Sequence, residues 1–289
     1  MSYDYSSTFA EVMSDPSFGN YGRLIFPVHE GYLYGSNLKD MDLHFYNHIC
    51  PDDTVDVVNY LKVTADSGKT LFYDIYTDEE KAADPEKKDT GLFYFRGEPG
   101  KPFAVICAGG GFEFVGAIHG GFPIALRVAE EGYNCFALIY RPDAQKSCED
   151  LARAIEFIFD HSEELEVDTR NYSVWGESAG ARMAAHIGSY GTKGFGGREL
   201  PRPAAVIMQY TGHRDFTKND PPTYANAGSN DIWHLDRAMV ERQKDMQAAG
   251  LISELTVYEG LPHGYALGAG TIAEGWHKEA VAFWEKFSK

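Results

Sequence analysis

From residue 100 to the C-terminus, short apolar runs alternate with longer segments in which apolar residues recur at helical spacing. Strands that alternate with helices in this way are typical of βαβ units, whose strands lie parallel in one sheet. The runs are apolar throughout, as expected of strands that helices cover on both faces. The runs that we interpret as strands are Phe103–Cys107, Cys135–Tyr140, Tyr172–Trp175, Ala204–Gln209, Thr223–Ala227 and Ile252–Tyr258.

Two further strands are predicted before this alternation begins. Val55–Val63 and Leu71–Tyr76 are rich in β-branched and aromatic residues, and a turn over residues 66–69 joins them. Such a pair predicts one antiparallel edge. Together the runs predict an α/β fold with a mainly parallel eight-stranded sheet and helices on both faces, formed by residues 53–289.

The first part of the chain, residues 1–52, is rich in aromatic residues, glycine and asparagine and shows little periodicity. We interpret it as an N-terminal extension of the domain. Three roles remain open for it: a cap over the site, a contact in a homodimer, or a surface wrap that only adds stability.

The composition argues against several kinds of partner. The 289 residues carry a formal net charge of −17, whereas nucleic acids and anionic membranes bind surfaces rich in Lys and Arg. No apolar run is long enough to span a bilayer, and the N-terminus lacks the basic start and apolar core of a signal peptide. The four cysteines form no CxxC pair and no cluster with metal-ligand spacing. We therefore predict a cytoplasmic protein without metal, cofactor, nucleic-acid or membrane partner.

A candidate nucleophile, Ser178, lies in the stretch Gly176-Glu177-Ser178-Ala179-Gly180. The pattern G-x-S-x-G is weak by itself and gains meaning from its context. Here a β-branched and aromatic run precedes it, and a helical pattern follows it. A serine between a buried strand and a helix lies on a sharp turn, where small flanking residues let the backbone pass close to its neighbours. The helix N-terminus also favours developing negative charge.

A serine hydroxyl needs a base to take its proton and an acid to orient that base. Enzymes with a nucleophilic serine on such a turn place the acid and then the base later in the chain, each in a loop after a strand. Asp231 and His263 fit this order, because each follows a predicted strand. His213 is the strongest alternative base, and Asp215 and Asp236 are alternative acids. Asp231 also fits a second role as a cap for the helix that follows it.

Donors for an oxyanion are predicted in the glycine loop Ala108-Gly109-Gly110-Gly111-Phe112, which follows a predicted strand. Three consecutive glycines let the backbone turn and direct N–H groups into the site, together with the N–H of Ala179. A phosphate-binding turn is the alternative. The chain lacks both the Lys-Ser/Thr pair of a P-loop and the G-x-G-x-x-G dinucleotide pattern, so the oxyanion interpretation is favoured.

With these motifs, the chain resembles α/β-hydrolase esterases of the hormone-sensitive-lipase and acetyl-esterase type over roughly residues 90–288. The segments that carry the resemblance are AVICAGGGF, LIYRPDA, GESAG and LTVYEGLPHGYAL. The resemblance implies that Gly110 and Gly111 supply oxyanion N–H groups with Ala179. Ala108 departs from the histidine that is frequent in these esterases. The short link over residues 210–222 is more similar to that of dienelactone hydrolases.

The function favoured by this pattern is that of a serine carboxylesterase for short acyl groups, acetyl to butyryl. Acetylated or cinnamoylated carbohydrates are substrates suggested by the resemblance alone. Phe112, Phe114 and Tyr265 are candidate walls of the substrate pocket, and core packing is the alternative for each. Two other functions remain open: an amide or peptide hydrolase of the same fold, such as a formamidase or a peptidase, and a non-catalytic binding protein.

Overall fold

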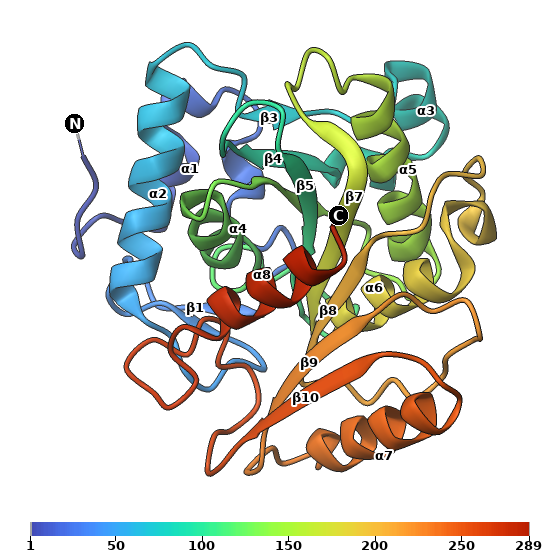
Figure 1. The fold of residues 1–289 in the computed structure, drawn as a ribbon. Helices are drawn as coiled ribbons and strands as arrows, with labels where there is room; N and C mark the ends of the chain where they lie inside the picture. Colours follow the sequence, from blue (N-terminus) through green and yellow to red (C-terminus); the bar gives the residue numbers. More distant parts are fainter. Residues whose placement is uncertain (1, 289) are drawn as a thin grey trace.

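The computed structural model describes residues 2–288, and one large sheet runs through it. The strands of this sheet are β3 (Phe72–Tyr73), β4 (Gly91–Phe95), β5 (Pro102–Cys107), β6 (Asn134–Ile139), β7 (Asp168–Glu177), β8 (Ala205–Gln209), β9 (Thr223–Gly228) and β10 (Ser253–Tyr258). Their order is β10-β9-β8-β7-β5-β6-β4-β3 (Figure 1). All neighbours from β10 to β6 are parallel, whereas β4 is antiparallel to both β6 and β3. The predicted eight-stranded, mainly parallel sheet is therefore confirmed.

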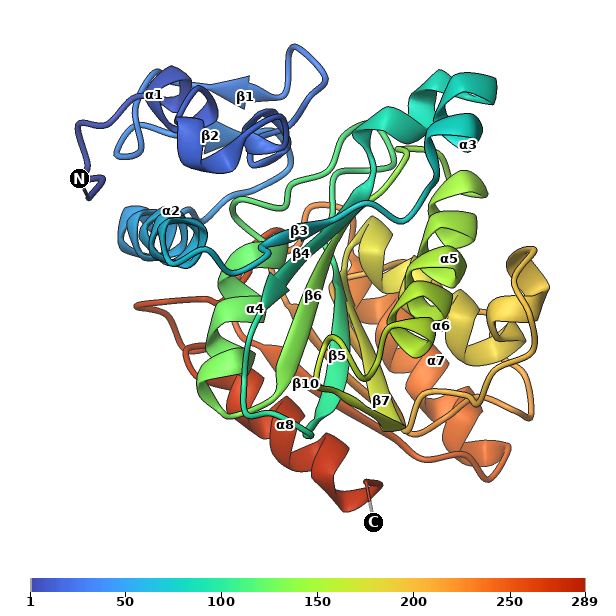
Figure 2. The same cartoon turned by 90° about the horizontal axis from the view of Figure 1, so that it is seen from above.

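Helices cover both faces of the sheet, as predicted (Figure 2). On one face lie α4 (Gly121–Glu130) and α8 (Trp276–Lys286), and on the other lie α5 (Lys146–Asp160), α6 (Ala179–Tyr190) and α7 (Leu235–Ala248). Buried strand residues such as Phe103, Val105 and Trp175 form the core between these layers. Within residues 2–288, no helix combines the length and the apolar character that a membrane crossing requires.

The N-terminal segment forms a small layer of its own beside the sheet (Figure 2). It contains α1 (Phe9–Met13), the 3₁₀ turns Pro16–Phe18 and Gly22–Leu24, and the antiparallel pair β1 (Leu33–Tyr34) and β2 (Asp42–Leu43). The helix α2 (Pro51–Asp66) follows and packs against α4. Shorter elements elsewhere are α3 (Asp78–Ala83) and the 3₁₀ turns Pro85–Asp89 and Thr192–Phe195.

The predicted strand Val55–Val63 is wrong, because these residues belong to α2. Their β-branched character favours a strand, but Val57, Val58 and Leu61 lie on one helical face, and that face is buried. Pro51 occupies the first turn, a position that favours a helix start. The antiparallel edge is instead made by β3 and β4, so the sheet still contains eight strands.

The carboxyl ends of the parallel strands meet at one edge of the sheet. In open α/β sheets, ligands bind outside this edge. β7 lies between β5 and β8, so a residue that follows β7 is at the centre of the edge. The loops after β5, β8, β9 and β10 surround that central position.

Candidate active site

Ser178 occupies the turn between β7 and α6, at the centre of this edge. Its φ of 51° and ψ of −113° form a conformation that residues other than glycine rarely adopt. The turn is tight: a Cβ on Gly176 would lie 2.2 Å from the carbonyl carbon of Gly180, and a Cβ on Gly180 would lie 2.0 Å from the carbonyl oxygen of Cys107. Only glycine fits at both flanking positions. The serine side chain is thereby held at the N-terminus of α6.

The structure brings Ser178, His263 and Asp231 together. His263 Nε2 lies 3.2 Å from Ser178 Oγ, and His263 Nδ1 lies 2.7 Å from Asp231 Oδ2. The side chains of His263 and Asp231 are 2% and 0% exposed. Because the buried carboxylate only accepts hydrogen bonds, this contact favours the imidazole tautomer that carries its proton on Nδ1. Nε2 then faces the serine as an acceptor.

Aromatic rings hold His263 in this orientation. The ring centroids of Trp233 and Tyr210 lie 4.6 Å and 4.7 Å from the centroid of the imidazole, both in edge-on contact. Asp231 is fixed from its other side, because its Oδ1 accepts a hydrogen bond from the backbone N–H of Trp233 at 2.9 Å. Asp231 therefore contacts the imidazole and also supports the loop that leads into α7.

The alternative residues lie near the site but make no such contacts within residues 2–288. His213 packs against His186, with 4.8 Å between ring centroids. Burial lowers the pKa of His213 to about 4. Asp215 and His213 both line the groove beside Ser178, and Asp236 lies in the first turn of α7.

The glycine loop after β5 lies against the nucleophile. Gly110 and Gly111 have φ values of 132° and 65°, which glycine adopts without strain. The Gly110 carbonyl accepts hydrogen bonds from the N–H groups of Glu113 and Phe114, which closes the loop. Among residues 2–288, no backbone hydrogen bond engages the N–H of Gly110, Gly111 or Ala179. These donors are free to meet an oxyanion.

A groove of about 490 Å³ opens beside Ser178. Of the three predicted pocket walls, Phe112 lines this groove. Phe114 and Tyr265 are fully buried and do not line it, so the prediction for these two is corrected. Phe114 stacks on Tyr32 in the core, and the Tyr265 hydroxyl bonds to Asn226. The lining residues are Gly111, Phe112, Ser178, Ala179, Arg182, Thr211, Gly212, His213, Arg214, Asp215 and Leu235.

Comparison with known protein families shows which family this chain belongs to. Residues 96–253, more than half of the chain, match the BD-FAE family. The chain belongs to the BD-FAE family. No match was found among curated protein sequences.

Solved structures with similar folds are α/β hydrolases and esterases. An acetyl ester-xyloside bifunctional hydrolase from Caldicellulosiruptor lactoaceticus is 18% identical, with a TM-score of 0.65 over 74% of this chain and 95% of that one. The α/β hydrolase MGS-M1 from a Medee basin deep-sea metagenome is 20% identical, with a TM-score of 0.57 over 68% and 92%. Thermogutta terrifontis esterase 2 phosphorylated by paraoxon is 19% identical, with a TM-score of 0.53 over 68% and 86%. At this identity the likeness establishes the fold, which is that of α/β hydrolases.

In this member of the BD-FAE family, a buried carboxylate lies directly before the nucleophile. Glu177 is 1% exposed. Its Oε1 accepts hydrogen bonds from the Tyr46 hydroxyl at 2.6 Å and from the Gly109 N–H at 3.1 Å. Its Oε2 accepts one from the Tyr210 hydroxyl. Burial raises the pKa of Glu177, while these donors oppose the rise.

The role of Glu177 was not predicted from the sequence. An acidic residue at the end of an apolar strand is a signal for a buried polar network, because an isolated buried charge is very costly. That signal was present beside the serine. Its partner Tyr46 is 131 residues away in the chain, and no sequence pattern around Tyr46 predicts this contact.

The N-terminal segment of this family member also reaches the site. Asn47 donates from its side chain to the His263 carbonyl at 2.9 Å. The ring of Phe45 packs edge-on against Trp233 and closely against Gly111, where an added Cβ would lie 2.9 Å from a ring atom. These contacts join the glycine loop and the histidine loop through one short stretch of residues.

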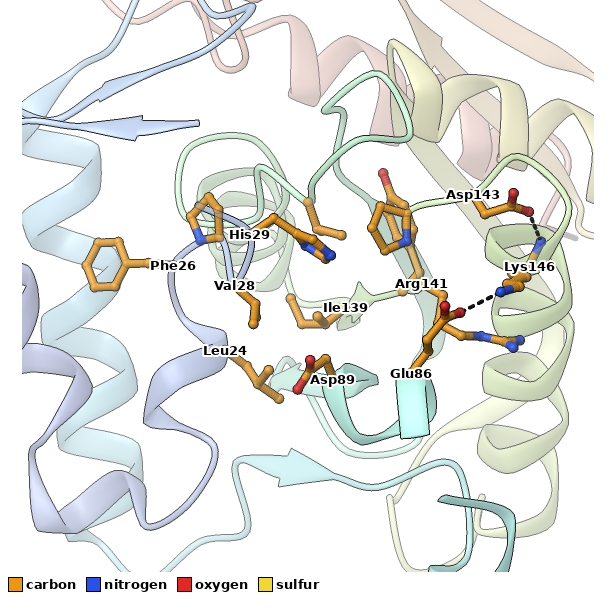
Figure 3. Close-up of a pocket in the computed structure, with 14 residues that line it drawn as sticks. Leu24, Phe26, Val28, His29, Glu86, Asp89, Ile139, Arg141, Asp143 and Lys146 are labelled. Atoms are coloured by element: carbon orange, nitrogen blue, oxygen red, sulfur yellow. Dashed lines mark hydrogen bonds and ion pairs between the residues drawn. The ribbon is translucent and has the colours of Figure 1, made fainter. Parts of the chain in front are cut away.

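A second hollow, of about 300 Å³, lies beside the N-terminal segment (Figure 3). Val115 lines this hollow, whereas Gly111 and Phe112 line the groove beside Ser178. The N-terminal segment forms its apolar wall, and Lys146 with its ion-pair partner Glu86 lies at its rim. Of these two hollows, the groove is the one that Ser178 lines.

Proposed function

We propose that this member of the BD-FAE family is a serine carboxylesterase that hydrolyses esters of short acyl groups, acetyl to butyryl. The contact chain from Ser178 through His263 to Asp231 carries this proposal, because it has the geometry that activates a serine hydroxyl. The free N–H groups of Gly111 and Ala179 beside it support the same conclusion. The likeness in fold to esterases is consistent with it.

In the proposed reaction, Ser178 Oγ attacks the ester carbonyl carbon while His263 Nε2 takes the hydroxyl proton. The carbonyl oxygen becomes an oxyanion, which accepts hydrogen bonds from Ala179 and from Gly111 or Gly110. The carbon–alkoxy bond then breaks, and His263 returns the proton to the leaving alcohol. A water molecule, deprotonated by His263, attacks the acyl group and releases the carboxylic acid and the free serine. Asp231 stabilises the imidazolium that forms in each step.

The preference for short acyl groups is supported by the surroundings of the groove. Phe112 lines it next to Gly111, and the link over residues 210–222 contains no helix that could line a long acyl tunnel. Each additional CH₂ that finds an apolar surface contributes only about 0.8 kcal/mol. Steric exclusion by the aromatic ring should therefore outweigh the hydrophobic gain for longer chains.

We also propose that residues 1–52 act as a cap that completes the catalytic domain, which we place at residues 53–289. Phe45, Tyr46 and Asn47 support this role, because each contacts a residue of the site. Helix α2 begins at Pro51, so it crosses the proposed boundary and ties the cap to the domain.

A covalent probe tests the nucleophile. A fluorophosphonate should add once to the wild-type protein and to Ser67→Ala, which changes an exposed serine, and should not add to Ser178→Ala. Intact-mass spectrometry counts the adducts. An adduct that persists in Ser178→Ala would refute the assignment.

A substrate series tests the reaction class. The values of kcat/KM for p-nitrophenyl acetate, butyrate, octanoate and palmitate should be highest for the two short esters and drop steeply by octanoate. A p-nitroanilide is measured beside them. Faster cleavage of the anilide than of the esters would favour an amide hydrolase, and the absence of both an adduct and turnover would favour a binding role.

A further inference from the structure

The groove beside Ser178 contains a cationic group without a partner. Arg182 lies one helical turn after Ser178 on α6, and its side chain is exposed in the groove. Among residues 2–288, it forms no ion pair with a carboxylate, and its one hydrogen bond is a 3.5 Å contact from Nε to His186 Nε2. The guanidinium therefore keeps most of its five N–H donors available, in a fork that matches a carboxylate.

The other charged groups of the groove do not satisfy Arg182. Arg214 is already paired with Glu241 at 2.6 Å and with Asp245 at 3.5 Å. Asp215 is the one carboxylate among the lining residues, and it lies beyond ion-pair distance of Arg182. His213 is held neutral by burial. The lining thus offers a free guanidinium in a chain whose formal net charge is −17.

We propose that the groove binds an ester whose alcohol part carries a carboxylate, and that Arg182 receives this carboxylate. The inference rests on the proposed esterase function. An acetyl group fills only a small part of a groove of about 490 Å³, so the alcohol part occupies most of it and reaches Arg182. The substrate class is that of acetylated hydroxy acids.

The subsite is tested with a matched pair of substrates, 4-acetoxybenzoate and methyl 4-acetoxybenzoate. The readout is the ratio of kcat/KM for the acid to kcat/KM for its methyl ester. In Arg182→Gln this ratio should fall about three- to tenfold, as expected for the loss of one charge-assisted contact in a partly exposed groove. In Asp215→Asn it should rise, because a repelling charge is removed. Opposite changes in the two variants cannot come from a general loss of structure.

A charge-matched control separates the local contact from the overall charge. Arg170→Gln removes an equal charge near the start of β7, at the opposite end of the strand from the serine, and should leave the ratio as in the wild type. Raising the salt concentration from about 0.1 M to about 0.5 M should lower the ratio more in the wild type than in Arg182→Gln, because salt screens the contact between the carboxylate and the exposed guanidinium. A ratio that stays within twofold in both Arg182→Gln and Asp215→Asn would overturn the subsite.

Failure of the esterase proposal gives a different result, because the wild type then hydrolyses neither ester. In that case a binding measurement tests whether Arg182 receives a carboxylate. Titration calorimetry with the Ser178→Ala protein compares 4-hydroxybenzoate with its methyl ester. Tighter binding of the acid that is lost in Arg182→Gln supports the subsite, and equal binding of the two compounds in both proteins overturns it.

Discussion

Replacement of Tyr46 by phenylalanine tests how strongly the N-terminal segment is tied to the site. The change removes one hydroxyl and leaves the ring in place. The lost hydrogen bond to the buried Glu177 carboxylate is 2.6 Å long, and hydrogen bonds to charged groups contribute about 1.5–3 kcal/mol. Because Glu177 keeps its contacts with Gly109 and Tyr210, we expect the lower part of this range, about 1.5–2 kcal/mol. At roughly 2–4 °C per kcal/mol for a domain of this size, Tm should drop by about 3–8 °C.

The same change should lower kcat more than it raises KM, because Glu177 Oε1 also holds the glycine loop that supplies the oxyanion donors. The assays are urea unfolding and steady-state hydrolysis of p-nitrophenyl acetate. Tyr133→Phe is the control, since Tyr133 donates to the exposed Glu285 far from the site, and it should leave kcat unaffected. A change in the free energy of unfolding below about 0.5 kcal/mol in Tyr46→Phe, the level of an ordinary surface substitution, would refute the reasoning.

Three further outcomes are expected. Asp231→Asn places an amide donor against Nδ1 of His263, which favours the wrong tautomer, so kcat for p-nitrophenyl acetate should fall by about 10³–10⁴ while thermal unfolding shows a folded protein. Gly176→Ala puts a Cβ 2.2 Å from the backbone of Gly180, and urea unfolding should show a loss of at least about 3 kcal/mol. Burial lowers the pKa of His119 from 6.5 to about 3. Between these pH values the unfolded state therefore binds more protons than the folded state. The free energy of unfolding should then fall as the pH falls below 6.5, by up to about 1.4 kcal/mol per pH unit. His119→Phe should show a shallower fall in urea unfolding from pH 7 to about 4.5, and equal slopes would contradict this assignment.

The strands at the centre of the sheet were predictable because their residues are apolar throughout and helical segments separate them. β5, β6, β8, β9 and β10 lie within a residue or two of the predicted runs. The antiparallel edge of the sheet was harder to predict, because an edge strand pairs on one side only and its sequence pattern is less restricted. The β-branched residues of α2 favoured a strand, whereas the buried helical face of Val57, Val58 and Leu61 prevailed once it could pack on α4. β4 was not anticipated, since its pairing with β6 joins segments far apart in the chain.

The proximity of Ser178, Asp231 and His263 was predictable for a topological reason. Each residue follows a strand, and the carboxyl ends of parallel strands meet at one edge. The network around Glu177 was not predictable in the same way. Tyr46 belongs to a segment without periodicity, so no pattern in the sequence places its hydroxyl against the strand that carries the serine. The sequence left open whether Phe114 and Tyr265 face the groove or the core for a related reason, since an aromatic residue in a loop after a strand can face either.

The net charge of the chain bears on large partners but does not determine which small ligand the groove binds. A formal charge of −17 argues against extended anionic partners such as nucleic acids, because these contact a large surface and meet the summed charge. A small ester meets only the charges within about 10 Å, the distance over which salt screens exposed groups at about 0.1 M. Within the groove those charges include the free guanidinium of Arg182. The acidic surface should therefore slow the approach of an anionic substrate at low salt, while the groove still holds it more firmly than its neutral ester once it has arrived.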